Sequence, residues 1–175
     1  TDITNASRTM LFNINTLTWD DELLKLFDIP KTLLPEVIHS DSCFGSLSEL
    51  GDITIHAVLG DQQAALFGQG CLEKGQLKST YGTGCFIMSN VGDEPIHSED
   101  GLLTTIGFSL NGKVYYAIEG SIYASGTTVQ WLRDNLQFFD KSDQSEIYLN
   151  EKGNANNVLF IPVSYTHLTL PTTPY

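Results

Sequence analysis

A tight hairpin restricts the fold of this chain more than any other feature of the sequence. Residues 102–109 and 114–118 alternate apolar and polar side chains, which is the pattern of strands with one buried face. Asn111 and Gly112 lie between the two runs, and this pair favours a two-residue turn because both residue types tolerate positive φ. The sequence therefore predicts an antiparallel strand pair that turns at residues 110–113.

A strand, a sharp turn and a helix are predicted in the middle of the chain. Residues 53–59 are rich in β-branched side chains, and this run ends at Gly60 and Asp61. Residues 62–67 have the apolar spacing of a helix that starts from the turn. This order of elements is typical of α/β folds, which place ligands at the carboxyl ends of their strands.

The remaining patterned segments complete the expected organisation. They are strands over residues 77–81 and 85–90 joined by Gly82-Thr83-Gly84, amphipathic helices over 19–27 and from 125 or 126 to 136, a partly helical loop over 140–157 and a buried strand over 158–162. The first helix has a polar start that can cap it, and Pro30 ends it.

The charge balance argues against two classes of partner. The chain of 175 residues carries 9 Lys and Arg against 21 Asp and Glu, a net charge of −12. Such a field repels the phosphates of nucleic acids and anionic lipids, and no apolar run approaches the length of a membrane-spanning helix. We therefore expect neither nucleic acid nor membrane as a partner, although backbone N–H groups can still bind a phosphate locally.

The cysteines and histidines give no sign of a metal site or a disulfide framework. Cys43, Cys71 and Cys85 include no C-x-x-C pair, and the four histidines are scattered without ligand spacing. We expect no metal ligands among these residues, and the three thiols are typical of a protein of the reducing cytoplasm.

Asp61 is the sharpest candidate for chemistry, and its pattern leaves two interpretations open. An aspartate at a turn in an α/β fold can accept a proton from a substrate hydroxyl. The same residue type at the same place is also a common cap for the helix that follows. Spacing alone does not decide between the general base and the cap.

Two glycine-containing segments are candidates for binding phosphate. Gly82 and Gly84 allow close approach to the backbone and Thr83 adds a hydroxyl, but a plain β-turn gives the same pattern. Gly126 and Gln130 lie one helical turn apart, where a backbone N–H and an amide could meet a nucleotide, and a surface turn is again the alternative. The sequence contains neither a Rossmann fingerprint nor a P-loop.

Six segments together resemble the FGGY family of carbohydrate kinases. They are TDITNASRTMLFNI, DIPKTLLPEV, GDQQAALFGQ, KSTYGTGCF, GLLTTIGF and SGTTVQWLRDNL. The resemblance extends from Thr1 to about residue 162, and within the family it is to the glycerol kinases rather than to the xylulose or gluconate kinases. It implies an α/β chain that is part of the actin/hexokinase-like (ribonuclease H-like) two-domain kinase fold.

The resemblance also implies a reaction and a role for each matching residue. The reaction is ATP-dependent phosphorylation of glycerol to glycerol 3-phosphate with Mg²⁺, by a cytoplasmic homo-oligomer. Asp61 matches the catalytic base, while Gln62 and Phe86 match substrate-binding residues. The nucleotide contacts match Gly82, Thr83, Gly126 and Gln130.

We expect the chain to be an internal part of a longer kinase and to be inactive by itself. On the family pattern, residues 1–69 would belong to the first domain, residues 70–163 to the second, and residues 164–175 to a non-native tail. Two rival functions stay open. One is phosphorylation of another polyol or sugar, and the other is noncatalytic ligand binding by a protein that kept the fold.

Overall fold

The computed structural model describes residues 1–153, 158 and 160, and the predicted tail at 164–175 lies outside them. The chain divides into two compact units. The first consists of Thr1–Ser79 and Ile87–Gly120, and the second of Thr80–Phe86 and the chain from Ser121. The predicted domain boundary after residue 69 falls inside the first unit and stays a prediction.

A four-stranded sheet, in the order β5-β6-β8-β7, organises the fold. Its strands are β5 (Leu77–Tyr81), β6 (Cys85–Gly92), β7 (Leu103–Leu110) and β8 (Lys113–Ile122). β7 and β8 form the predicted antiparallel hairpin, and its turn residues Asn111 and Gly112 have φ values of 52° and 75°. The predicted hairpin and the predicted strands at 77–81 and 85–90 are confirmed.

A β-bulge at Gly107 shifts the pairing register between β7 and β8. Ile106 pairs with Tyr116 and Phe108 pairs with Tyr115, so Gly107 is the extra residue on its strand. A side chain there would place its Cβ 3.2 Å from Leu66 Cδ2. Glycine therefore lets helix α3 (Asp61–Gly68) pack closely on this strand.

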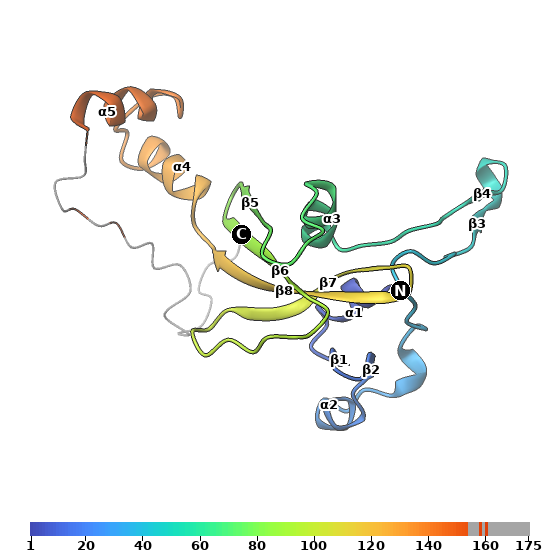
Figure 1. Ribbon diagram of the computed structural model, residues 1–175. Coiled ribbons are helices and arrows are strands. Elements are labelled where there is room, and N and C mark those ends of the chain that lie inside the picture. The colour runs from blue at the N-terminus through green and yellow to red at the C-terminus, as the bar shows by residue number, and fades with distance from the viewer. Residues whose placement is uncertain (154–157, 159, 161–175) are drawn as a thin grey trace. The chain divides into compact units, whose positions relative to one another are not determined.

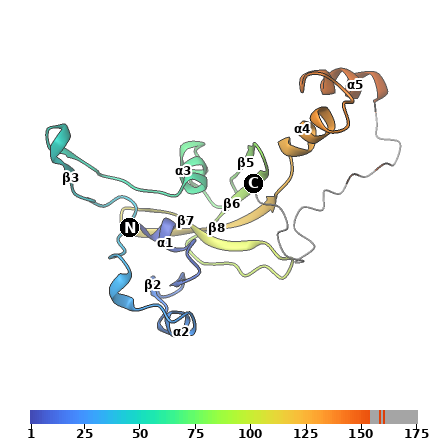
Figure 2. The ribbon, with the colours of Figure 1, turned by 180° about the vertical axis from the view of Figure 1, so that it is seen from behind.

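Within the first unit, a helix packs on each face of the sheet. One face packs with helix α1 (Ile3–Ala6), and the other with α3, as Figures 1 and 2 show from opposite sides. Each face has its own apolar cluster: Ile3, Ala6, Phe12, Val91, Ile106 and Tyr116 on the α1 side, and Leu66, Cys71, Met88, Phe108 and Ala117 on the α3 side. The sheet thus carries α1 and α3 on a common rigid support.

A small hairpin and a capped helix follow α1. Strands β1 (Phe12–Asn13) and β2 (Thr18–Trp19) pair, and helix α2 (Asp21–Leu26) follows. The Asp20 carboxylate accepts hydrogen bonds from the backbone N–H groups of the second and third helical residues, which is the expected cap. The predicted helix over 19–27 is confirmed, with a later start. A 3-10 turn η1 (Lys31–Leu33) comes after it.

The strand predicted over residues 53–59 is wrong beyond Thr54. Only β4 (Ile53–Thr54) is a strand, and it pairs with β3 (Ser46–Leu47) across the short 3-10 turn η2 (Ser48–Leu50). Isolated backbone hydrogen bonds hold residues 55–59. The Ile55 N–H donates to the Gly45 oxygen at 2.8 Å, and the Val58 N–H donates to the Ser40 oxygen at 3.0 Å. Among the described residues, no further strand pairs with the β-branched run, so the ladder extends no further.

Among the described residues of the second unit, two segments are helical. Helix α4 (Gly126–Asp134) confirms the predicted helix, and α5 (Gln144–Lys152) lies within the segment predicted to be partly helical. The side chains of Val158 and Phe160 are 74% and 51% exposed, which contradicts burial of a strand at these two positions; its other residues lie outside the described ones. Within the described part of the chain, no helix is both long and apolar enough to cross a bilayer.

Candidate functional site

Asp61 is the first residue of α3, on a turn formed by Gly60. Gly60 occupies the N-cap position, so the alternative that Asp61 is the capping residue does not describe this turn. The Asp61 side chain is exposed, and its Oδ1 accepts a hydrogen bond from the backbone N–H of Gln62 at 2.8 Å. The turn follows the irregular segment after β4 and not a strand, contrary to the sequence-based expectation. Asp61 therefore presents a carboxylate to solvent from a helix N-terminus.

A buried hydrogen-bond network holds this turn in place. The backbone N–H of Gly60 donates to Thr4 Oγ1 at 2.9 Å, and the Thr4 hydroxyl donates to Asp2 Oδ2 at 2.6 Å. Asp2 is fully buried and also accepts hydrogen bonds from Asn5 Nδ2 and Ser40 Oγ. Burial by itself raises the pKa of Asp2, but the hydrogen bonds from Thr4, Ser40 and Asn5 together outweigh it and lower that pKa. An ionised Asp2 thus fixes Thr4, and Thr4 fixes Gly60 beside Asp61.

We expect Thr4→Val to destabilise the protein. Valine has nearly the same shape but leaves the Gly60 N–H without its acceptor and the buried Asp2 carboxylate without one donor. The free energy of unfolding should fall by about 1–3 kcal/mol, measured by urea unfolding. Thr16→Val is the matched control, because Thr16 is exposed and its hydroxyl contacts the hydroxyl of Thr18, which is also exposed. Equal stability of the Thr4 variant and the control variant would show that the network does not hold the turn.

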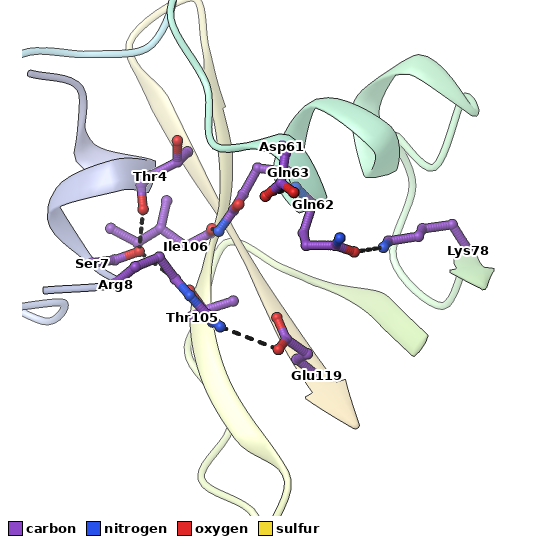
Figure 3. Close-up of polar contacts among 10 residues, drawn as sticks. All are labelled: Thr4, Ser7, Arg8, Asp61, Gln62, Gln63, Lys78, Thr105, Ile106 and Glu119. Carbon is purple, nitrogen blue, oxygen red and sulfur yellow. Dashed lines mark hydrogen bonds and ion pairs between the residues drawn. The ribbon is translucent and has the colours of Figure 1, made fainter. Parts of the chain in front are cut away.

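The two glutamines after Asp61 have different surroundings. Gln63 is buried, and its Nε2 donates to the backbone oxygen of Ile106 at 3.3 Å (Figure 3). Gln62 is half-buried, and its Oε1 accepts a hydrogen bond from Lys78 Nζ. Gln63 therefore belongs to the packing of α3 on β7. Gln62 lies beside Asp61 and is partly exposed, so it can still contact a substrate, as its predicted role requires.

In the second unit, the turn between β5 and β6 lies against the start of α4. The Gly82 oxygen accepts from Gly126 N–H at 2.9 Å, and the Thr83 oxygen accepts from Ser125 N–H at 2.9 Å and from Thr127 N–H at 3.3 Å. The structure thus brings together Gly82, Thr83 and Gly126, which are far apart in the sequence. Thr83 stays exposed on this assembly.

The role expected for the Gly126 N–H needs correction. This group was expected to meet a nucleotide, but it donates to the Gly82 oxygen instead. Glycine is needed for another reason, since a Cβ at residue 126 would lie 2.5 Å from that same oxygen. Gly126 therefore permits close contact between the turn and α4, and Gln130 is exposed one helical turn further on.

We expect Gly126→Ala to weaken the second unit. The added Cβ meets backbone rather than a flexible side chain, so the start of α4 must move away from the turn. The free energy of unfolding should fall by about 1–3 kcal/mol. Urea unfolding followed by Trp131 fluorescence, in a Trp19→Phe background, reports on α4. Gly68→Ala is the control because its Cβ would meet nothing within 4 Å; if the two variants unfold alike, the contact is not close in solution.

Phe86 belongs to the same unit as the glycine turn. Its ring is half-buried, and ring atom Cε2 lies 3.3 Å from the place where a Cβ of Gly84 would be. The predicted site residues thus fall into two groups. Asp61 and Gln62 lie in the first unit, and Gly82, Thr83, Phe86, Gly126 and Gln130 in the second.

Sequence reasoning missed Lys78 and the network of Asp2 and Thr4. The polar run at the start of the chain contributes to the sequence-based predictions only through the family resemblance. Its signal is an aspartate directly before a short helix whose second residue is threonine, which is a capping pattern. Among the residues that the structure describes, no three His, Cys, Asp or Glu side chains gather as a metal site.

Comparisons with known proteins identify the family. Residues 1–68 match the N-terminal domain of the FGGY family of carbohydrate kinases, and residues 77–168 match its C-terminal domain. A glycerol kinase of Natranaerobius thermophilus is 51% identical to this chain. The matched region covers 93% of this chain and 33% of that protein. The chain therefore spans about a third of the length of this relative.

Solved structures agree with this match. A glycerol kinase of Plasmodium falciparum, solved with ADP, superimposes with a TM-score of 0.77 at 42% identity, over 86% of this chain and 31% of that one. A xylulose kinase of Lactobacillus acidophilus superimposes with a TM-score of 0.71 at 24% identity, over 87% of this chain and 32% of that one. The predicted α/β architecture, part of an actin/hexokinase-like kinase fold, is thereby confirmed. The chain belongs to the FGGY family of carbohydrate kinases.

Proposed function

We propose that this chain is part of an ATP-dependent glycerol kinase, which forms ADP and glycerol 3-phosphate. The observation that carries the proposal is the exposed Asp61 carboxylate at the start of α3, on a turn held by Thr4. Similarity supports glycerol over other substrates, because a glycerol kinase is 51% identical to this chain whereas the xylulose kinase structure is 24% identical.

Asp61 takes the role of general base. One of its carboxylate oxygens accepts the proton of a terminal glycerol hydroxyl as the oxygen of that hydroxyl attacks the γ-phosphorus of ATP. A carboxylate of ordinary basicity is sufficient, because phosphoryl transfer depends more on positioning and charge stabilisation than on a strong base. Gln62 supplies a polar contact to the substrate and Phe86 an apolar wall for its carbons, which is the combination that a small polyol requires.

ATP supplies the phosphoryl group, and the second unit has the features to hold it. Thr83 is exposed on a turn whose backbone is fixed by α4, so its hydroxyl can meet a phosphate without reorganising. Gln130 presents an amide from the same helix. The described residues do not gather acidic ligands for Mg²⁺, so no step is assigned to that ion through this chain.

We propose that the complete enzyme has the two-domain organisation of the family. The first domain ends near residue 69 and the second begins near residue 70. We also propose that the complete enzyme is a cytoplasmic homo-oligomer, as its resemblance to the family implies.

Substrate comparison in the complete enzyme tests the proposal. With saturating ATP, kcat/KM for glycerol should exceed kcat/KM for xylulose and for gluconate at least about 100-fold, since sites that hydrogen-bond hydroxyl groups discriminate strongly. A larger kcat/KM for either sugar substrate would assign the protein to a different specificity in the family. ATP binding without turnover on any of the three would favour the noncatalytic alternative.

A further inference from the structure

Lys78 is buried to an unusual degree for its type. It lies on β5 with 1% of its surface exposed, and it is among the largest fully buried side chains of the described residues. Lysine is almost never fully buried unless its ammonium group is paired, because removing that charge from water is costly. One of its partners is Gln62, whose Oε1 accepts a hydrogen bond from Lys78 Nζ (Figure 3).

This contact fixes the orientation of the Gln62 amide. An ammonium group has three donors and no acceptor, so the amide atom that faces it must be the oxygen. The amide nitrogen Nε2 is therefore turned away from Lys78, and its two N–H groups are directed elsewhere. Without the lysine, the amide could rotate by half a turn and present its oxygen in place of its nitrogen.

We propose that Lys78 is a positioning residue that holds Gln62 with its NH₂ group toward the substrate. The inference rests on the proposed function and extends it. Asp61 then offers an acceptor and Gln62, its neighbour in sequence, offers a donor. A polyol with hydroxyl groups on adjacent carbons fits this pair, since one hydroxyl donates its proton to Asp61 while the oxygen of another accepts from Gln62.

A double-mutant cycle in the complete enzyme tests whether Lys78 acts through Gln62. Lys78→Met and Gln62→Ala should each raise the glycerol KM about 10-fold, as for loss of an oriented hydrogen bond. The double variant should be no worse than Gln62→Ala alone, because the lysine has no amide left to orient. Lys74→Met is the control and should leave KM unchanged, because Lys74 is an exposed lysine in the loop before β5. Multiplied KM effects in the double variant would overturn the proposal.

A second variant keeps the inference testable if Lys78→Met does not fold. Gln62→Glu keeps an oxygen for Lys78 but replaces the NH₂ group with a second oxygen, so the side chain becomes an acceptor-only carboxylate. It should raise the glycerol KM about as much as Gln62→Ala, and a KM within about threefold of the wild-type value would overturn the proposal. These results are separable from the function itself: a wild-type enzyme that does not phosphorylate glycerol refutes the proposed function, whereas an active wild type with an additive cycle refutes only the role of Lys78.

Discussion

Asp61→Asn in the complete enzyme is expected to lower kcat for glycerol phosphorylation about 100-fold to 10,000-fold while glycerol KM stays within about threefold. The amide has the shape of the carboxylate and can still contact the substrate, but it cannot take the proton of the attacking hydroxyl. Steady-state kinetics with saturating ATP give both parameters. Asp93→Asn, at another exposed aspartate of the first unit, is the matched control and should retain wild-type kcat.

Near-normal turnover by the Asp61 variant would mean that Asp61 has only a structural role. Its hydrogen bond from the Gln62 N–H would then be its whole contribution, as for acidic residues that stabilise the first turn of a helix. The kinetic test therefore separates the general base from the helix-stabilising residue, which the sequence pattern leaves undecided.

The 175-residue chain by itself is expected to show no measurable glycerol-dependent ADP formation. It spans about a third of the length of the glycerol kinase it matches, and the groups that align both substrates are expected to be spread over that whole length. Alignment of reacting groups contributes about 7–11 kcal/mol to lowering a barrier, so losing a large part of it abolishes detectable turnover.

A coupled assay for ADP measures this directly. The complete enzyme under the same conditions is the positive control, and circular dichroism of the chain confirms that folded material was assayed. Glycerol-dependent turnover by the pure chain would mean that residues 1–175 contain every group that the reaction needs.

Elements with a local cause could be predicted from the sequence. The β7–β8 hairpin is specified by Asn111 and Gly112, which adopt positive φ with little strain, and α2 by the cap at Asp20. The strand predicted over 53–59 is wrong because β-branched composition predicts extended backbone, whereas a ladder also needs a neighbouring strand. In the part of the chain that the structure describes, the partner strand is β3, and it pairs with two residues of this run.

The parts of the candidate site that were missed depend on contacts between distant segments. Lys78 resembles a surface lysine in sequence, whereas the structure buries it and brings its ammonium group to Gln62 on α3. First-turn donors lack helical partners, which predicts a free N–H at Gly126, but this N–H donates to the carbonyl oxygen of Gly82 in the β5–β6 turn. Both departures result from tertiary structure, which residue spacing does not encode.

A crystal structure of the complete enzyme with glycerol and ADP would locate both ligands directly. We expect an Asp61 carboxylate oxygen within about 3.2 Å of a terminal glycerol hydroxyl, and the nucleotide phosphates at the turn formed by Gly82 and Thr83. Glycerol bound away from Asp61, or phosphates bound away from that turn, would contradict this expectation.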